Sequence, residues 1–328
     1  MTNFTDGGTR TTRRSLLPDG GEFDRPETDF RDRIEADPDA EFPAEAGRYH
    51  LYISRACPWA HGAALVRKLY GLEDVISMDI VDPYRDERGW MFTPGTDEEC
   101  TPDTVNGFDF LAEVYEAAAP GFSAKPSVPV LWDRERDTIV NNESIEIMRM
   151  LATAFDEFAT TDADLYPAGR RDDIDDVVDR IYDPINNGVY RAGFATTQDA
   201  YEAAVTDLFD ALDYWEGVLD DQRYLLGDEL TLADVRLFPT LVRFDPVYNI
   251  HFKCSLRRLV DYPNLWNYTK DVYQHPGVAE TVNMDHITEH YYTTHESVNP
   301  KRIVPLGPDV DFTEPHDRDQ LSAGAPSA

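Results

Sequence analysis

The segment that decides the fold of this chain reads RYHLYISRACPWAHGAALVRKLY from Arg48 to Tyr70. A β-like run over Tyr49–Ser54 leads to a single cysteine, Cys57, and Pro58 with an apolar helical pattern follows at once. Proline favours the first helical position, where a missing N–H costs nothing. Cys57 is therefore the expected N-cap residue, with its sulfur near the free amides and the positive end of the helix dipole. Because this position can lower a thiol pKa from ~8.5 into the ~3.5–7.5 range, we expect a reactive thiolate.

The fourth position of the motif holds Ala60, where a Cys-x-x-Cys redox pair has its second cysteine. A disulfide formed on Cys57 must then be resolved by a separate thiol molecule. The motif therefore favours monothiol chemistry over protein disulfide exchange. The alternative is a small buried cysteine that starts a helix and has no chemical role.

Charge narrows the classes of partner. The 328 residues include 63 acidic and 30 basic side chains, for a formal net charge of −33, and the acidic excess runs along the whole chain. This pattern is typical of salt-accumulating halophiles, where high ionic strength screens the self-repulsion. It argues against nucleic acid, which is bound through Lys and Arg, and against anionic membrane surfaces. The length is sufficient for two domains, each with its own core.

The chain has three cysteines, Cys57, Cys100 and Cys254, which are too few for a disulfide framework and odd in number. This content favours a reducing compartment. A twin-arginine-like stretch at residues 12–17 is followed by polar residues, so we expect no export. No run approaches the ~18 apolar residues of a membrane span. We therefore expect a cytoplasmic protein.

The chain divides into segments of different composition. The expected segments are an N-terminal extension (1–46), an α/β domain (47–156), a linker (157–170), an all-helical domain (171–295) and a C-terminal tail (296–328). The extension is polar and either wraps the fold or stays mobile. We expect Asp309–Ala328 to be disordered.

Alternating strand and helix patterns indicate the α/β unit. After the first strand and helix, the pattern predicts strands at 75–80, 128–132 and 138–140, and helices at 108–118 and 142–155. Pro129 places its strand at an edge of the sheet unless the peptide bond is unusual. Asn142 is the expected cap of the last helix, with Glu143 in its first turn.

The second half is almost entirely helical in pattern. Apolar residues recur at helical spacing from Ile174 to Ile181 and from Tyr201 to Trp215. Thr231–Asp234 is a capping signature for a helix that runs to about Arg243 and contains Pro239.

The chain resembles the glutathione transferase superfamily in several motifs that occur in the same order. Within that superfamily it resembles the glutathionyl-hydroquinone reductases. The motifs that carry the resemblance are Cys57-Pro-Trp-Ala60, Gly89-Trp90-x-Phe92, Val128-Pro-Val-Leu-Trp132-Asp, Asn142-Glu143-Ser144, Asn186-Asn-Gly-Val-Tyr190-x-Ala-Gly-Phe194-Ala, Arg243-Phe-Asp-Pro-Val-Tyr248, His251-Phe-Lys-Cys254 and His286-Ile-x-x-His-Tyr291-Tyr-x-x-His295. They cover roughly residues 45–308.

This resemblance implies a thioredoxin-like domain followed by a glutathione-transferase-type helical domain (α/β plus all-α), paired as a homodimer. It also implies a reaction in which Cys57 removes a thiol from a glutathionyl-hydroquinone and releases the hydroquinone. The mixed disulfide left on Cys57 is then cleared by a second thiol molecule. The implied co-substrate is glutathione or γ-glutamylcysteine, without a metal.

The resemblance assigns a thiol-binding set. Val128 would pair through its backbone with the cysteinyl part of the thiol, because Pro129 after it would be cis. Ser144 would hold the γ-glutamyl carboxylate at a helix N-terminus, and Glu143 its ammonium. Trp90 would lie over the bound thiol.

Lys125 departs from the family, which usually presents an arginine before this proline strand. A lysine offers a point charge instead of a bidentate fork, so its hold on a glycine carboxylate would be looser. We therefore hypothesise γ-glutamylcysteine, which lacks that glycine, as an alternative natural thiol.

Three tyrosines complete the implied site. Tyr190 would give the departing hydroquinone its proton, since an ordinary phenol of pKa ~10 is protonated at neutral pH. Tyr248 and Tyr291 would hydrogen-bond the Cys57 thiolate and lower its pKa. Tyr292 stays an alternative to Tyr291.

Other interpretations stay open. One is a broader monothiol transferase acting on mixed disulfides or dehydroascorbate, and another is a non-catalytic transferase-like binding protein. His286, His290 and His295 have helix-like spacing, but a metal site would need a further ligand and a placed carboxylate, so we expect no metal.

Overall fold

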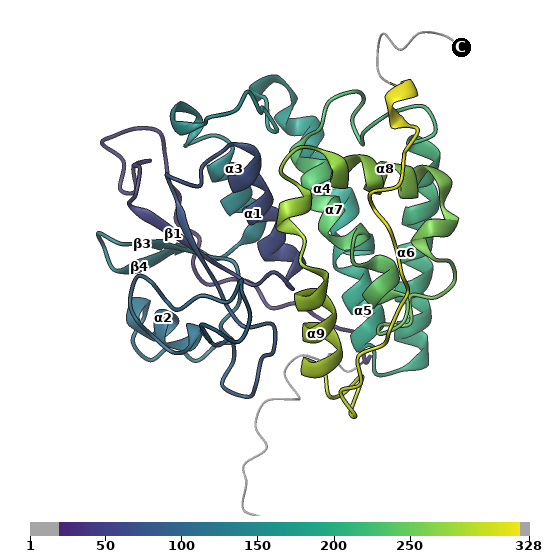
Figure 1. The fold of residues 1–328 in the computed structure, drawn as a ribbon, viewed down its shortest axis with the longest axis horizontal. Helices are drawn as coiled ribbons and strands as arrows, with labels where there is room; N and C mark the ends of the chain where they lie inside the picture. Colours follow the sequence, from purple (N-terminus) through teal and green to yellow (C-terminus); the bar gives the residue numbers. More distant parts are fainter. Residues whose placement is uncertain (1–19, 322–328) are drawn as a thin grey trace, which may run out of the picture.

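The structure is a computed structural model that describes residues 20–321 of the chain. The twin-arginine-like residues 12–17 lie outside the described residues. An N-terminal thioredoxin-like domain packs against a C-terminal helical domain (Figure 1). The elements of the first domain are β1 (Tyr49–Ile53), α1 (Pro58–Leu69), β2 (Ser77–Ile80), α2 (Leu111–Ala118), β3 (Val130–Asp133), β4 (Thr138–Asn141) and α3 (Ser144–Leu151).

The sheet has the strand order β2-β1-β3-β4, with β1 parallel to β2 and antiparallel to β3. Helices α1 and α3 cover one face and α2 lies on the other (Figure 1). Of the two alternatives for Pro129, an edge strand or an unusual peptide bond, the structure has the unusual bond, because β3 lies between β1 and β4. The Val128–Pro129 bond is cis, and β3 begins only at Val130, so the proline takes no position that requires an N–H.

The cap of α3 also differs from the expectation. Glu143 is the N-cap residue, and its carboxylate accepts a hydrogen bond from the Ile145 amide. Asn142 does not cap the helix, because its side chain accepts from the Phe30 amide and donates to the Tyr115 hydroxyl. Tertiary partners have therefore recruited the expected capping residue.

The helical domain follows the predicted pattern. Its elements are α4 (Arg171–Ile181), α5 (Gly188–Phe194), α6 (Gln198–Val218), α7 (Leu232–Leu241), α8 (Pro263–Gln274) and α9 (Met284–Thr294). The capping box of Thr231 and Asp234 is present at the start of α7, which ends before the expected Arg243. Two π-helical turns are present: Tyr182–Asn186 precedes α5, which carries Tyr190, and Phe244–Tyr248 ends with Tyr248. The two domains meet where α1 packs against α7.

The N-terminal extension wraps the fold over its described part. A segment we call the strap (residues 20–32) runs from the α5–α6 connection to β4. The Thr196 amide donates to the Gly21 carbonyl at 3.0 Å, and the Asp32 amide donates to the Val140 carbonyl at 3.0 Å. The strap therefore bridges both domains.

The tail is more ordered than expected. Phe312 is buried against Trp266 and Tyr273, and the Arg318 guanidinium donates to the Leu219 carbonyl. The expected disorder is therefore wrong for residues 309–321, because one aromatic side chain and one buried arginine anchor them.

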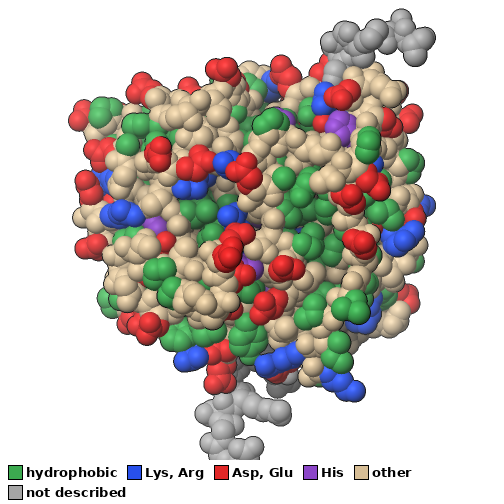
Figure 2. Space-filling model, in the orientation of Figure 1, with side chains coloured by type: hydrophobic (Ala, Val, Ile, Leu, Met, Phe, Trp, Pro, Cys, Tyr) green, Lys and Arg blue, Asp and Glu red, His purple; other side chains and the backbone are tan. Residues whose placement is uncertain are grey.

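Acidic side chains are scattered across the face shown in Figure 2, without one dominant patch. Within residues 20–321, no helix is both long and apolar enough to cross a membrane.

Candidate functional site

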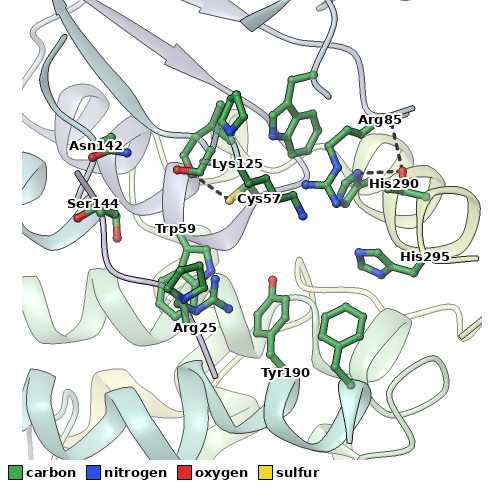
Figure 3. Close-up of a pocket in the computed structure, with 18 of the residues that line it drawn as sticks. Arg25, Cys57, Trp59, Arg85, Lys125, Asn142, Ser144, Tyr190, His290 and His295 are labelled. Atoms are coloured by element: carbon green, nitrogen blue, oxygen red, sulfur yellow. Dashed lines mark hydrogen bonds between the residues drawn. The ribbon is translucent and has the colours of Figure 1, made fainter. Parts of the chain in front are cut away.

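Cys57 lies at the N-terminus of α1 as its N-cap, directly before Pro58, which confirms the local prediction. Its thiol donates to the Val128 carbonyl across a 3.6 Å Sγ–O distance. The sulfur faces a cavity of about 1270 Å³ between the two domains (Figure 3). Cys57 therefore lies between β1 and α1, as the sequence predicts.

The expected low pKa of the thiol is not what the structure shows. Burial raises the pKa of the Cys57 thiol, although the amides of Ala60 and Trp59 and the charges of Arg243 and Arg25 act in the opposite direction. Desolvation penalises the thiolate, and here it exceeds the helix-terminus effect. The amides and guanidiniums remain the groups that favour the thiolate.

The implied thiol-binding residues line the same cavity. The lining includes Val128, which precedes β3, and Glu143 and Ser144 at the N-terminus of α3. The structure adds Arg236 of α7, whose Nη1 donates to the Ser144 hydroxyl at 2.8 Å. A buried guanidinium beside this hydroxyl favours a bound carboxylate. Only tertiary packing brings Arg236 here.

Trp90 lines the cavity and stacks on His290 of α9, with ring centroids 4.8 Å apart. The indole is 4 % exposed, so it serves both the core and the cavity wall. His290 is held by the Pro83 carbonyl, and burial lowers its pKa to about 3. It is therefore a neutral part of the wall.

Lys125 lies at the cavity mouth and is not the only cation there. It retains exposed surface, but enclosure of its ammonium and the charges of Arg85 and Arg25 lower the pKa of Lys125 to about 8. Arg85 and Lys125 face the same space in Figure 3. Arg85 was not singled out by any motif, and it adds a second positive charge beside Lys125.

The three tyrosines form a buried chain of hydroxyls. Tyr291 hydrogen-bonds both Tyr190 and Tyr248, the latter at 3.0 Å. Tyr292 instead donates to the Pro246 carbonyl at 2.9 Å, which favours Tyr291 in the implied role. Burial raises the pKa of each phenol in the chain, so each stays protonated at neutral pH.

The expected hydrogen bonds from Tyr248 and Tyr291 to the sulfur of Cys57 do not occur within residues 20–321. Both hydroxyls are turned to the tyrosine chain, because Tyr291 lies between the other two phenols. Tyr190 and Tyr291 both line the cavity, and Tyr190 points its hydroxyl toward Cys57 (Figure 3). The phenol chain therefore approaches Cys57 through Tyr190.

The strap contributes Arg25, which sequence reasoning missed. Its Cζ lies 4.6 Å from the Trp59 ring centroid and 4.8 Å from that of Tyr190. No local signal in the polar segment around Arg25 distinguishes it from the other arginines of the extension. Its place depends entirely on the strap crossing the cavity.

One group of potential metal ligands lies outside the cavity within the described part of the chain. Ligand atoms of Asp97, Cys100 and His286 lie within 4.8 Å of one another. The Nε2 atom of His286 and a carboxylate oxygen of Asp97 are 3.2 Å apart. His290 and His295 do not join this group and line the cavity instead.

Comparison with known proteins agrees with this architecture. The family model "Glutathione S-transferase, N-terminal domain" matches residues 56–154, and "Glutathione S-transferase, C-terminal domain" matches residues 198–271. The fold and the cysteine-centred cavity therefore define a member of the glutathione transferase superfamily.

More similar relatives narrow the family. The chain is 49% identical to glutathionyl-hydroquinone reductase PcpF of Sphingobium chlorophenolicum, over 92% of this chain and 95% of that protein. It is 47% identical to glutathionyl-hydroquinone reductase YqjG of Escherichia coli K12, over 97% of this chain and 99% of that protein. A xi-class transferase structure from Natrialba magadii superposes with a TM-score of 0.88 at 60% identity, covering 90% of each chain. The chain belongs to the xi-class family of glutathionyl-hydroquinone reductases.

Proposed function

We propose that this protein reductively removes a glutathione-type thiol from glutathionyl-hydroquinones through a mixed disulfide on Cys57. The observation that carries the proposal is the arrangement of one cavity. A single cysteine without a resolving partner faces a carboxylate-binding corner at Ser144 and Arg236 on one side and a protonated phenol, Tyr190, on the other.

In the first half-reaction the Cys57 thiolate attacks the sulfur attached to the hydroquinone ring. An S–S bond forms, the C–S bond breaks, and its electron pair stays with the ring, whose carbon receives a proton supplied by Tyr190. In the second half-reaction a free thiolate attacks the mixed disulfide and restores Cys57. The products are hydroquinone and a symmetric disulfide.

Tripeptide binding uses the remaining residues. The Val128 backbone would pair with the cysteinyl unit, Ser144 and Arg236 would hold the γ-glutamyl carboxylate, and Glu143 would hold its ammonium. Trp90 would cover the thiol, and Lys125 with Arg85 would face the terminal carboxylate. The glutathione-bound structure of YqjG, 48% identical with a TM-score of 0.85 over 89% of this chain and 96% of that chain, supports a thiol of this class.

The thiol itself is either glutathione or γ-glutamylcysteine. Arg85 beside Lys125 supports a hold on a terminal glycine carboxylate, which favours glutathione over the looser binding expected from a lone lysine. Turnover with each thiol in molar salt decides between them, and a clear preference for γ-glutamylcysteine would contradict the role of this cation pair.

The decisive experiment follows hydroquinone release from a glutathionyl-hydroquinone plus free thiol in molar salt. Cys57→Ser should abolish release, while Cys254→Ser should retain it, because Cys254 is buried away from the cavity. Mass spectrometry of the wild type without added thiol should show one thiol adduct on Cys57. Equal rates in wild type and Cys57→Ser would overturn the proposal, and activity on mixed disulfides alone would indicate the broader thioltransferase.

We further propose a cytoplasmic homodimer adapted to high salt. The net charge of −33 and the 60% identity to the Natrialba magadii transferase support the salt adaptation. Three free cysteines in the described structure are compatible with a reducing compartment. Light scattering across a salt series tests the assembly, and a monomer at molar salt would contradict it.

A further inference from the structure

The strap crosses the cavity between fixed points in both domains. At one end Thr196 and Thr197 hold the carbonyls of Gly21 and Gly20, and at the other Phe30 exchanges hydrogen bonds with Asn142. Because both ends are anchored, the residues between them have a defined place over the cavity. They include Arg25.

One nitrogen of the Arg25 guanidinium has a hydrogen-bond partner in the described structure, and another is buried without one. The Nε of Arg25 donates to the Asn187 amide oxygen at 3.0 Å, while its Nη2 is buried without a hydrogen-bond partner in the described structure. The guanidinium adjoins the rings of Trp59 and Tyr190 (Figure 3). A buried N–H without an acceptor is costly, so its presence beside a cavity points to a ligand atom.

The ligand of this donor is an anion or a strong acceptor, because a guanidinium always carries its charge. The carboxylates of the thiol have other candidates, namely Ser144 with Arg236 and Lys125 with Arg85. Arg25 instead lies over the face of Tyr190, the proposed proton donor, with its Cζ 4.8 Å from the ring centroid.

We propose that Arg25 forms a binding site for a ring oxygen of the hydroquinone and stabilises its negative charge as the C–S bond breaks. This inference rests on the proposed function. Tyr190 first protonates the ring carbon that bears the sulfur, while the adjacent ring hydroxyl gives up its proton and becomes a carbonyl, so Tyr190 regains a proton through water. When the Cys57 thiolate takes the sulfur, the C–S bond electrons re-form the aromatic ring and the carbonyl pair moves onto the oxygen as a hydroquinonate. The hydroquinonate then takes a proton from water, so charge and protons balance. Preorganised donors of this kind act where water is excluded.

The strap thereby defines a substrate class: hydroquinones with an ionisable ring oxygen next to the thioether-bearing carbon. Single-turnover formation of the mixed disulfide isolates this step from the return of the thiol. A series of glutathionyl-hydroquinones with methyl to chlorine substituents varies the acidity of that oxygen. Arg25→Gln should slow the step by about 100-fold for the least acidic hydroquinone. The loss should shrink as the ring hydroxyl becomes more acidic.

Arg25→Lys should recover part of the rate, because it keeps the charge but not the planar donor arrangement. Arg33→Gln is the matched control, since Arg33 is an exposed arginine near the strap that does not line the cavity. It should react as the wild type does.

The outcomes separate the two proposals. If the wild type forms no mixed disulfide with any substrate, the proposed function fails. If the wild type reacts and Arg25→Gln matches it, the role of Arg25 fails while the function stands. An equal loss for every substrate would also overturn the role of Arg25, because it would indicate an effect on the Cys57 thiolate alone.

Discussion

Arg243 donates from its Nε to the carbonyl oxygen of Ala56 at 3.1 Å, directly before Cys57. The same guanidinium donates to the carbonyls of Arg55 and Pro239 at 2.7 and 2.8 Å. Arg243 follows α7 and is fully buried. Arg243 of the helical domain therefore holds the loop that positions Cys57. The positive charge of Arg243 also favours the Cys57 thiolate.

Arg243→Lys should lower the free energy of unfolding by about 3 kcal/mol, because one ammonium leaves buried carbonyls without donors. The same substitution should move the positive charge away from Cys57, and the thiolate would then be less favoured. Alkylation of Cys57 should therefore require a higher pH. Urea melts and the pH profile of iodoacetamide labelling measure both effects. Arg257→Lys, at an exposed pair with Asp213, should stay within about 0.5 kcal/mol of the wild type.

The tyrosine chain makes a separate prediction. Tyr190→Phe should slow hydroquinone release by about 100-fold, because the proposed proton donor is lost. Tyr291→Phe should have a smaller effect on the same step, since it removes only the partner that orients Tyr190. Tyr292→Phe should cost about 1 kcal/mol of stability through its bond to Pro246 and leave release unchanged. A larger loss in Tyr292→Phe than in Tyr291→Phe would reverse the assignment.

Local chemistry explains what the sequence could predict. Pro58 after Cys57 is sufficient to define a cap, and the capping box of Thr231 and Asp234 depends only on residues three apart. Asn142 had the right chemistry for a cap, but the strap and Tyr115 occupied its side chain. No local pattern contains those partners.

Burial and long-range contacts explain the rest. The thiol of Cys57 was expected to be acidic from its helix position, yet desolvation depends on the whole cavity. Arg25 lies in a segment whose composition is compatible with disorder, and only hydrogen bonds to residues such as Thr196 place it. The family motifs predict most of the cavity lining, whereas Arg25, Arg85 and Arg236 reach the cavity from positions outside those motifs.

Close packing behind the tyrosines predicts an intolerant glycine. A Cβ at Gly193 of α5 would lie 2.2 Å from the ring of Phe252, which stacks on Tyr248. Gly193→Ala should therefore cost about 1–3 kcal/mol and slow release, despite the better helix propensity of alanine. Gly217→Ala in α6 meets nothing within 4 Å and should instead stabilise by about 0.5–1 kcal/mol. Thermal melts in high salt compare the two, and a stabilised Gly193→Ala would show that Phe252 can move.

The lowered pKa of Lys125 predicts a pH-dependent affinity for the terminal carboxylate. With a pKa of about 8 in the free protein, Lys125 is charged below that pH and neutral above it. S-methylglutathione has no titrating thiol, so its affinity should fall by roughly three- to tenfold as the pH rises from 7 to 9. Binding above pH 8 should take up a proton, because the bound carboxylate favours the ammonium.

Calorimetry in buffers of different ionisation enthalpy measures both the affinity and the proton. The glycyl ethyl ester of S-methylglutathione lacks the carboxylate and should show little change across the same pH range. Lys125→Arg should remove the dependence for the free acid, since a guanidinium stays charged throughout. If the ester and the acid weaken in parallel, the titrating group is not at the terminal carboxylate, and Lys125 with Arg85 would have to face another part of the substrate.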